Sequence, residues 1–591
     1  MKRIEVPVLI VGGGVAGLSC SMILAKLGVE SRLVTYFPGT SPQPKAHIIN
    51  QRSMEIFTEL GVADAIYKVS TPPHTMKYAG WYAGVGGKSP YHGREIGRVE
   101  AWGAAGDDPD YPAASACRPA NYPQMYLEPI IKAHAEQMAP GCLHYYQELV
   151  DFAQDDEGVT AVVRNRADDE LYEVRCRYML AADGGKTVGP KLGIEMQASG
   201  KPMRMSSVHF AADLSPWMGG SDVLTRFLIN PDFGGSWASG VLLPEGPTRW
   251  GNQSEEWVYH SRYTFSDTEP LDHEKVLARM HEVLGIPDLK VDVHHVSEWV
   301  MGGFLASRYR EGRVFLVGDA CKKHPPTGGL GLNSAVQDAY NLCWKLALVL
   351  RNAAGEALLD SYETERRPVA ERNVAVALGN AMQHFLIDAA IGLSDDKSPE
   401  ENWDCLRRVW DDSPESEPLR VAVANAIAKQ RIGFRHHNVE FGYTYAQGAI
   451  VDDGSPAAEP IDPILLYQPS TRPGHPVPHA MLSRLGQLTP ISSFVEGGSF
   501  VLLAGEEGQA WVDAAQTVAA TLGVPIRALR VGLYDGDYID MRGAWARHRG
   551  TGPRGAVLVR PDRYVAFRAE DAVDEPERHL KDVLRRILSM S

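Results

Sequence analysis

Val8-Leu9-Ile10-Val11-Gly12-Gly13-Gly14-Val15-Ala16-Gly17 joins an apolar strand to the first residues of a helix. Gly12, Gly14 and Gly17 form the pattern G-x-G-x-x-G, and the Ala/Leu-rich helix that follows ends near Gly28. Glycines at these places permit a tight turn, close approach of the backbone to a pyrophosphate and close packing of helix on strand. The helix N-terminus then faces the phosphates. The segment therefore predicts a dinucleotide-binding βαβ unit.

A second glycine-rich segment follows another apolar run, Val314-Phe315-Leu316-Val317. It begins with Gly318-Asp319, passes through Pro325-Pro326 and ends in Gly328-Gly329-Leu330-Gly331-Leu332-Asn333, where a long helical pattern starts. A carboxylate at a strand end, rigid prolines and a glycine approach to a helix suit a large, flat cofactor with polar edges. A third strand-like run ends in the same way, at Asp183-Gly184-Gly185.

The bulk properties of the 591 residues narrow the class of protein. The length predicts more than one domain. The net charge of −15 argues against a nucleic-acid partner. No apolar run is long enough to span a bilayer, and Glu5, Pro7 and the glycines interrupt a possible secretion signal, so we expect no membrane contact. The seven cysteines lack C-x-x-C spacing, which indicates reduced thiols in a cytoplasmic protein, with no disulfide framework and no metal site.

With Arg52 and Gln124-x-x-Leu127 between them, the three segments resemble the single-component (class A) FAD-dependent aromatic hydroxylases. The resemblance is closest to the branch of phenol hydroxylase and 2,4-dichlorophenol 6-monooxygenase, through His47-Ile48-Ile49-Asn50-Gln51-Arg52-Ser53-Met54-Glu55-Ile56. It implies an α/β fold with an FAD-binding Rossmann-type domain like that of p-hydroxybenzoate hydroxylase. An interleaved β-sheet substrate domain and a C-terminal thioredoxin-like domain would complete the chain.

The implied domains alternate along the sequence. The FAD-binding domain would comprise residues 1–80, 120–195 and 300–375, and the substrate domain residues 81–119 and 196–299. Residues 376–440 would form a helical connection, and residues 441–591 the thioredoxin-like domain. This last stretch has no cysteine, so it cannot run dithiol chemistry. We expect it to support a homodimer or a higher homo-oligomer.

The resemblance also implies which residues contact the cofactor. They run from the first glycine turn to the start of the long helix: Gly12, Gly14, Gly17, Arg52 and Gln124 at the diphosphate and ribityl region, Asp183 and Gly184 for cofactor binding and reductant access, Asp319 at the ribityl chain, Pro326 beside the flavin ring, and Gly329, Leu330, Gly331, Leu332 and Asn333 at its pyrimidine edge.

Two residues depart from the expected pattern. Dinucleotide folds usually place an acid at the end of the second strand to bind ribose hydroxyls, and Thr35 occupies that place here. A threonine can still hydrogen-bond a hydroxyl, though more weakly than a carboxylate. Lys322 stands where the family commonly has histidine, and we expect it to be solvated in a loop. Arg366, late in a helical run, is expected to form a surface ion pair.

The implied reaction consumes NADH or NADPH, O2 and a small phenolic substrate. Reduced FAD would form a C4a-hydroperoxide that hydroxylates the ring ortho to its hydroxyl group. An FAD oxidoreductase of related fold that inserts no oxygen is the alternative function. A non-catalytic flavoprotein, or a scaffold whose tail binds a partner, is a third.

Two residues are the candidates for catalysis. Phenols react better when deprotonated, which requires a base near the hydroxyl group. In the phenol hydroxylase pattern an aspartate precedes the motif arginine, and His47 holds that place here, either as the base or as a packing residue. Tyr259 is the choice for the substrate-site tyrosine of the family, with Arg249, Arg262 and Tyr263 as rivals, although strand aromatics are more often core residues.

Overall fold

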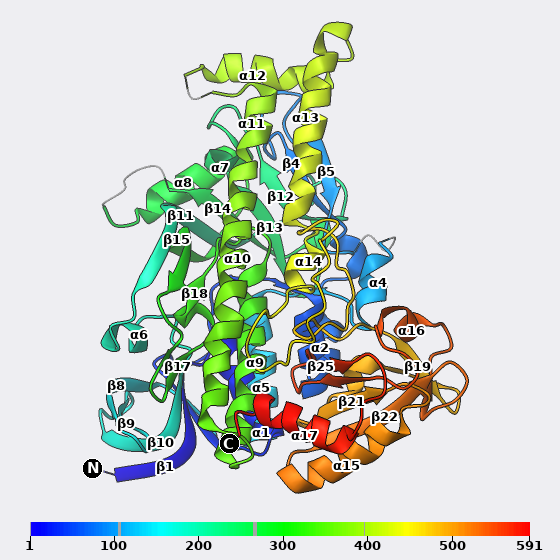
Figure 1. Ribbon diagram of the computed structural model, residues 1–591. Helices are drawn as coiled ribbons and strands as arrows, with labels where there is room; N and C mark the ends of the chain where they lie inside the picture. Colours follow the sequence, from blue (N-terminus) through cyan, green and yellow to red (C-terminus); the bar gives the residue numbers. More distant parts are fainter. Residues whose placement is uncertain (1, 105–107, 264–268, 395, 591) are drawn as a thin grey trace.

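The computed structural model describes residues 2–104, 108–263, 269–394 and 396–590, arranged as in Figure 1. The first sheet is built around β1 (Lys2–Val11), which runs parallel to both β10 (Leu171–Ala181) and β2 (Ser31–Thr35). The strand order is β16-β17-β10-β1-β2-β7, and β9 and β8 extend the sheet from β10. The other strands are β7 (Leu143–Tyr145), β8 (Gln147–Gln154), β9 (Val159–Asn165), β16 (Arg310–Glu311) and β17 (Val314–Leu316).

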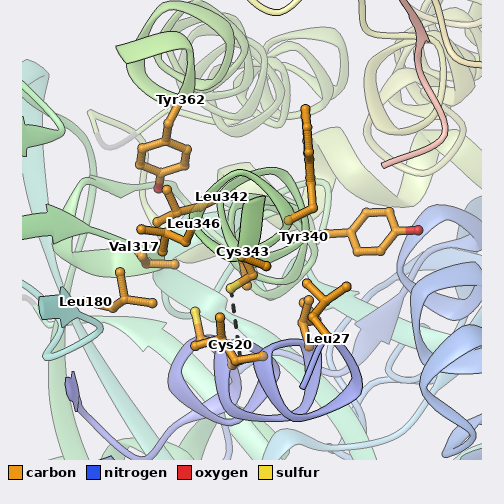
Figure 2. Close-up of a cluster of buried hydrophobic side chains, with 14 of the residues drawn as sticks. Cys20, Leu27, Leu180, Val317, Tyr340, Leu342, Cys343, Leu346 and Tyr362 are labelled. Atoms are coloured by element: carbon orange, nitrogen blue, oxygen red, sulfur yellow. Dashed lines mark hydrogen bonds between the residues drawn. The ribbon is translucent and has the colours of Figure 1, made fainter. Parts of the chain in front are cut away.

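Helix α1 (Val15–Lys26) lies against both α9 (Leu330–Leu350) and α5 (Gln124–Met138). Figure 2 shows this core, in which Cys343 Sγ of α9 lies 4.0 Å from the carbonyl oxygen of Cys20 in α1. Helices α1 and α9 are apolar around most of their surface because the rest of the protein covers them on most sides. Since β2, β1, β10 and β17 are parallel, their carboxyl ends meet at one edge of the sheet, where ligands of such folds bind.

The second sheet has the order β18-β15-β11-β14-β13-β12-β4-β5 and is mostly antiparallel. Helix α8 (His273–Leu284) covers one face of it. Two of the expected domain boundaries, 80/81 and 299/300, fall inside its strands β4 and β15. The strands are β4 (Tyr78–Tyr82), β5 (Glu95–Glu100), β11 (Met196–Ala211), β12 (Val223–Leu228), β13 (Val241–Gly246), β14 (Glu256–Arg262), β15 (Asp292–Ala306) and β18 (Lys322–Lys323).

The C-terminal part forms a third sheet with the order β20-β19-β23-β22-β21-β24-β25, drawn in orange and red in Figure 1. Helix α15 (Gln509–Leu522) connects the parallel strands β21 (Phe500–Ala504) and β22 (Ile526–Gly532), and α17 (Pro576–Ile587) packs beside α15. This arrangement confirms the thioredoxin-like fold. The remaining elements are β19 (Met481–Arg484), β20 (Gln487–Pro490), β23 (Tyr538–Ile539), α16 (Ala544–His548), β24 (Ala556–Val559) and β25 (Val565–Ala569).

A long helical segment connects the sheets and projects at the top of Figure 1. By length and composition the segment Glu356–Ile391 could cross a membrane, whereas we expected no such apolar run from the sequence. In the structure α10 packs against β15 and α9. The connecting helices are α10 (Ser361–Gln383), α11 (Phe385–Ile391), α12 (Pro399–Arg407), α13 (Glu417–Lys429) and α14 (His437–Glu440).

Short elements complete the fold around the first sheet. Strands β3 (Ile48–Ile49) and β6 (Ala120–Asn121) pair with each other just before α2 (Gln51–Leu60) and α5. The remaining helices are α3 (Ala63–Val69), α4 (Asp110–Ala114), α6 (Val188–Lys191) and α7 (Ser236–Ser239).

Candidate functional site

The glycine turn between β1 and α1 has no room for side chains. Gly12 has φ +117°, and a Cβ there would lie 2.1 Å from the carbonyl oxygen of Ala182. A Cβ on Gly17 would lie 1.9 Å from the carbonyl oxygen of Gly12. Gly14 caps the N-terminus of α1. The turn therefore brings bare backbone to a helix N-terminus, which fits the diphosphate of a dinucleotide.

Open space lies beside two other glycines of the predicted site. A Cβ on Gly331, in the first turn of α9, or on Gly184, after β10, would meet nothing within 4 Å. Gly329 precedes α9 with φ +62°, and Pro326 is exposed. The first turn of α9 carries backbone N–H groups without partners inside the helix. A flat ring with an anionic edge fits this space, because the N–H groups and the helix dipole favour negative charge.

Asp319 follows β17 at the same sheet edge. Its side chain is accessible to solvent, yet protein surrounds it densely, and the loss of hydration raises the pKa of its carboxyl group. The positive charges of Lys323, Lys322 and Lys45 act in the opposite direction. An accessible carboxylate in such an enclosed place suits a hydroxyl-rich ligand such as the ribityl chain. Lys45 was missed from the sequence, where it stood in a turn-rich stretch without a motif.

Asp183 and Gln124, two further residues expected at the cofactor, make different contacts. Asp183 accepts hydrogen bonds from the backbone N–H groups of Gly185, Thr187 and Val188, so its carboxylate holds its own loop. Gln124 donates to Glu128 Oε1 at 2.6 Å. That Glu128 oxygen lies 3.4 Å from the Cβ position of Gly14, so this pair borders the glycine turn.

Thr35 also lies at the glycine turn. Its Cγ2 is 2.8 Å from the Cβ position of Gly13. Glu128 is buried and places a carboxylate at the turn, where the sequence motif had only Thr35. Nothing near Glu128 in the sequence signals this role, since it comes from the first turns of another helix.

Arg52 is buried and contacts its own helix and the C-terminal part. Its guanidinium Nη1 donates to Glu55 Oε2 at 2.7 Å, and its Cζ lies 4.1 Å from the centre of the Phe441 ring. Glu55 in turn lies 3.8 Å from Arg563 of the C-terminal domain. These contacts of Arg52 support the joining of α2 to the C-terminal part, and its role at the cofactor stays a prediction.

Lys322 and Arg366 are buried, contrary to the expectation of solvated side chains. Both pair with the fully buried Asp338 of α9, Arg366 through Nε at 2.9 Å. Next to them Glu365 is bound by Lys345 at 2.7 Å and by Arg560 of the C-terminal domain at 2.6 Å. We call Asp338, Glu365 and these cations the buried ion network. Each carboxylate there has cationic partners, which such burial requires.

Asn333 holds β3 against the start of α9. Its side chain accepts a hydrogen bond from Asn50 N–H at 2.9 Å and donates to the carbonyl oxygens of Ile48 at 3.0 Å and Gly329 at 2.7 Å. The side chain is therefore occupied within the protein. It fixes the segment that carries His47 to the glycine loop of the predicted flavin site.

His47 is half-buried just before β3. Its Nδ1 lies 2.5 Å from Oδ1 of Asn121, and the Asn121 amide nitrogen donates to Thr71 Oγ1 at 2.6 Å. The loss of hydration lowers the pKa of His47, and the bond to Asn121 opposes this. Because Asn121 presents an oxygen, His47 carries its proton on Nδ1. Its Nε2 then holds a lone pair, and no described residue makes a hydrogen bond with that atom.

Tyr259 faces the side of the second sheet that α8 covers. It packs with Val276 and Met280, and its hydroxyl donates to the Ser239 carbonyl oxygen at 3.0 Å. Burial raises the pKa of Tyr259 to about 12. Successive residues of a strand alternate between faces, so His260 lies on the other face. Burial lowers the pKa of His260 to about 4, and the positive charge of His47 acts in the same direction.

His260 and Ser207 face each other on β14 and β11. Trp299 Nε1 donates to Ser207 Oγ at 2.7 Å, and we assign the Ser207 hydroxyl as the donor to His260 Nδ1 at 2.6 Å. With this assignment His260 carries its proton on Nε2, opposite to His47. Among the described residues none hydrogen-bonds that Nε2. The site thus combines one histidine that accepts with one that donates.

Glu256 lies on the same face of β14 as His260. His209 Nε2 and Tyr126 hydroxyl both lie 2.6 Å from its Oε2, and His294 Nδ1 lies 3.7 Å away. His209, Glu256 and His294 are close enough to hold a metal ion, although the cysteine pattern had led us to expect no metal site. The two short hydrogen bonds already occupy Oε2, so we assign the group to holding β14 against α5.

A groove of about 990 Å³ lies between η4 (Glu356–Asp360), α10 and residues 444–447. Its wall includes Arg310, Glu365 and Arg367, and none of its residues comes from the glycine turn, the Asp319 loop or the second sheet. It borders the buried ion network, and we do not assign the chemistry to it.

Comparisons with known proteins match the whole length of the chain. A family model described as "FAD binding domain" covers residues 5–377, and one described as "Aromatic-ring hydroxylase, C-terminal" covers residues 470–590. Phenol 2-monooxygenase of Pseudomonas sp. (strain EST1001) is 34% identical over 98% of this chain and 92% of its own. 2,4-Dichlorophenol 6-monooxygenase of Delftia acidovorans is 35% identical over 99% of each. The crystal structure of the flavin-dependent monooxygenase PieE in complex with FAD and substrate has a TM-score of 0.91 at 37% identity, with both chains fully covered.

Proposed function

This chain belongs to the FAD-dependent aromatic hydroxylases, and we propose that it hydroxylates a phenolic ring ortho to the hydroxyl group with His47 as the base. The family and the enzyme class rest on the matches over the whole chain. The ring position, the base and the nicotinamide are the proposal.

Bound FAD supplies electrons from NADH or NADPH and the activation of O2. The chain's part is to hold this cofactor and to exclude water around it. Gly12, Gly14 and Gly17 would hold the diphosphate, Asp319 the ribityl chain, and the first turn of α9 the pyrimidine edge. These residues fit because backbone N–H groups face the anionic parts and a carboxylate faces the hydroxyl groups.

The two histidines divide the work on the substrate. His47 Nε2 accepts the phenolic proton, because its Nδ1–H is held by Asn121. His260 Nε2–H donates a hydrogen bond to the phenolate oxygen, because its Nδ1 accepts from Ser207. Deprotonation raises the electron density of the ring carbons ortho to the oxygen, where an electrophilic oxygen attacks. The hydrogen bonds of His47 Nδ1 to Asn121 and of His260 Nδ1 to Ser207 are the observation that carries this proposal.

The test uses purified holoenzyme, a panel of phenols and isotopically labelled O2. We expect NADH or NADPH consumption that the substrate stimulates, and a catechol product that carries one labelled oxygen atom beside the original hydroxyl. Comparison of NADH and NADPH at equal concentration decides which one is the reductant. Consumption of the nicotinamide with no labelled product from any phenol would point to the FAD oxidoreductase that inserts no oxygen.

The chain's aromatic small-molecule substrate follows from its family, whereas its assembly and location are proposals. We propose a homo-oligomer in the cytoplasm without membrane contact, supported by the free, mostly buried cysteines and by a C-terminal domain that has no cysteine. Light scattering on the eluted holoenzyme measures the assembly directly, and a monomeric mass would remove that part of the proposal.

A further inference from the structure

Two buried side chains with unpaired polar atoms, Asn380 and His436, lie beside Gly328 at the glycine loop of the flavin site. Asn380 Nδ2 lies 3.3 Å and His436 Cε1 3.4 Å from the Cβ position of Gly328. Asn380 is 4% exposed and His436 1%. Within the described residues, neither side-chain amide atom of Asn380 nor His436 Nε2 makes a hydrogen bond. Buried polar groups are rarely left unpaired, so these atoms indicate a missing partner.

An aromatic cluster borders the same place. Trp81 stacks on Phe227 at 5.2 Å between ring centres, and Phe227 lies 4.4 Å from His384. Phe434 joins Trp81 to Trp102, whose ring lies 6.3 Å from His47. Among the described residues, the indole N–H groups of Trp81 and Trp102 and Nδ1 of His384 also lack partners. The cluster therefore has flat apolar walls with several unsatisfied polar atoms.

Gly328 and Gly329 lie between the side chains of Asn380 and His436 and the segment that carries His47. A Cβ on Gly329 would lie 3.2 Å from Cβ of Ile48, the neighbour of His47, while Gly328 borders Asn380 and His436. Adjacent residues are about 3.8 Å apart. A planar substrate over the glycine loop can thus have one oxygen at His47 and another toward Asn380.

The surroundings of Asn380 are uncharged. Burial lowers the pKa values of His384 and His436 to about 4, so both rings are neutral at pH 7. Arg435, next to His436, is paired with Asp108 and Asp110. A carboxylate would find no free cation among the described residues here, whereas a neutral oxygen finds donors.

We propose that Asn380, His436 and the indole N–H groups of Trp81 and Trp102 form a recognition subsite for a second, neutral oxygen substituent of the aromatic substrate. The group is a hydroxyl, which accepts from the Asn380 amide or an indole N–H and donates to Nε2 of His436, because Nδ1–H of His436 is bound to the carbonyl oxygen of Ile432. The aromatic cluster packs on the ring. The preferred substrate is therefore an aromatic with at least two oxygen substituents. The inference rests on the proposed function only in placing the reacting hydroxyl at His47.

Dissociation constants of the holoenzyme, followed by the change in flavin absorption, test the subsite without turnover. The probes are two matched pairs: resorcinol against m-cresol, and a dihydroxynaphthalene against the methylnaphthol of the same shape. The wild type should prefer the dihydroxy member at least about tenfold in one pair. Asn380→Leu and His436→Phe should abolish this preference and leave binding of the methyl member unchanged. Their Tm should not fall, because each removes an unpaired buried polar group.

Asn373→Leu is the matched control, since Asn373 lies two turns earlier on α10 and is also buried with an unpaired Oδ1. This variant should keep the preference. A wild type without preference in either pair, or an Asn380→Leu variant that retains it, would overturn the subsite. Labelled-oxygen incorporation is scored separately with the same compounds. If no probe is hydroxylated, the proposed function fails, while the ratio of dissociation constants still decides the subsite.

Discussion

Nδ1 of His47 lies 2.5 Å from the side-chain oxygen of Asn121, and this contact decides which nitrogen of the ring can act as a base. The amide of Asn121 is itself oriented, because its nitrogen donates to Thr71. The proton of neutral His47 therefore stays on Nδ1 and the lone pair on Nε2. A hydrogen bond of this kind is the usual means by which proteins choose a histidine tautomer.

Asn121 should accordingly control how activity depends on pH. In Asn121→Asp a carboxylate faces Nδ1, which stabilises the protonated ring and raises the pKa of His47. The base is then lost at higher pH, so the acid limb of kcat/KM should move upward by about one unit. Asn121→Leu should lower kcat/KM by about tenfold or more without this shift. If the acid limb does not move in Asn121→Asp, the titration of His47 does not determine the pH profile of kcat/KM.

Tyr259 and His260 should respond in opposite ways to removal of their polar groups. Tyr259→Phe loses one hydrogen bond to Ser239, so we expect about 1 kcal/mol less stability and near-normal kcat. His260→Phe removes the predicted donor to the phenolate, so we expect kcat to fall by about tenfold or more. Steady-state kinetics and thermal melts of both variants make the comparison. A lower kcat in Tyr259→Phe together with a normal kcat in His260→Phe would assign the hydrogen bond to the phenolate to Tyr259.

Gly331 and Gly17 should separate cofactor affinity from folding. Gly331→Ala adds a methyl group to open space in the first turn of α9, so the apoprotein should keep its Tm while FAD binds about tenfold more weakly. Gly17→Ala would drive a Cβ to within 1.9 Å of a carbonyl oxygen, so the fold itself should suffer. FAD titration of the apoprotein and its Tm are the two measurements. Unchanged FAD affinity in Gly331→Ala would exclude the ring from this position.

The buried ion network should join the C-terminal domain to the rest of the protein. Glu365→Ala leaves Lys345 and Arg560 buried without their shared carboxylate, which should cost about 3–5 kcal/mol of unfolding free energy. The exposed pair of Arg554 and Asp571 is the control, and Arg554→Ala should change stability by about 1 kcal/mol at most. Urea unfolding measures both. Equal effects of the two substitutions would mean that the network contributes no more than a surface pair.

Much of the fold could be predicted because the residues that indicate each strand, turn and helix are neighbours in the sequence. The turn at Gly12 needs a positive φ and bare backbone, which glycine provides. The apolar pattern on either side of it predicts the strand and the helix. The same holds for Asp319 at the end of β17. In both cases the residues that make the signal are neighbours in the chain.

The second sheet shows why the substrate site could not be predicted equally well. The choice between Tyr259 and His260 depends on which face of β14 meets α8, and strand alternation turns an error of one residue into the opposite face. Lys322 and Arg366 looked like loop and surface residues. Their common partner Asp338 lies in α9, outside the local sequence pattern around either of them, so no local pattern could reveal the pairing.

If neutral His47 takes the phenolic proton, the pH dependence of hydroxylation should change in His47→Ala. Hydroxylation of a phenol, measured as kcat/KM from about pH 5 to about pH 9, should fall about a hundredfold at neutral pH in the variant. The wild type should keep its activity down to the lowered pKa of His47, below 6.5, and lose it as the ring is protonated, while the variant should lack this acid limb. A His47→Ala enzyme that hydroxylates as well as the wild type, with the same acid limb, would exclude His47 as the base.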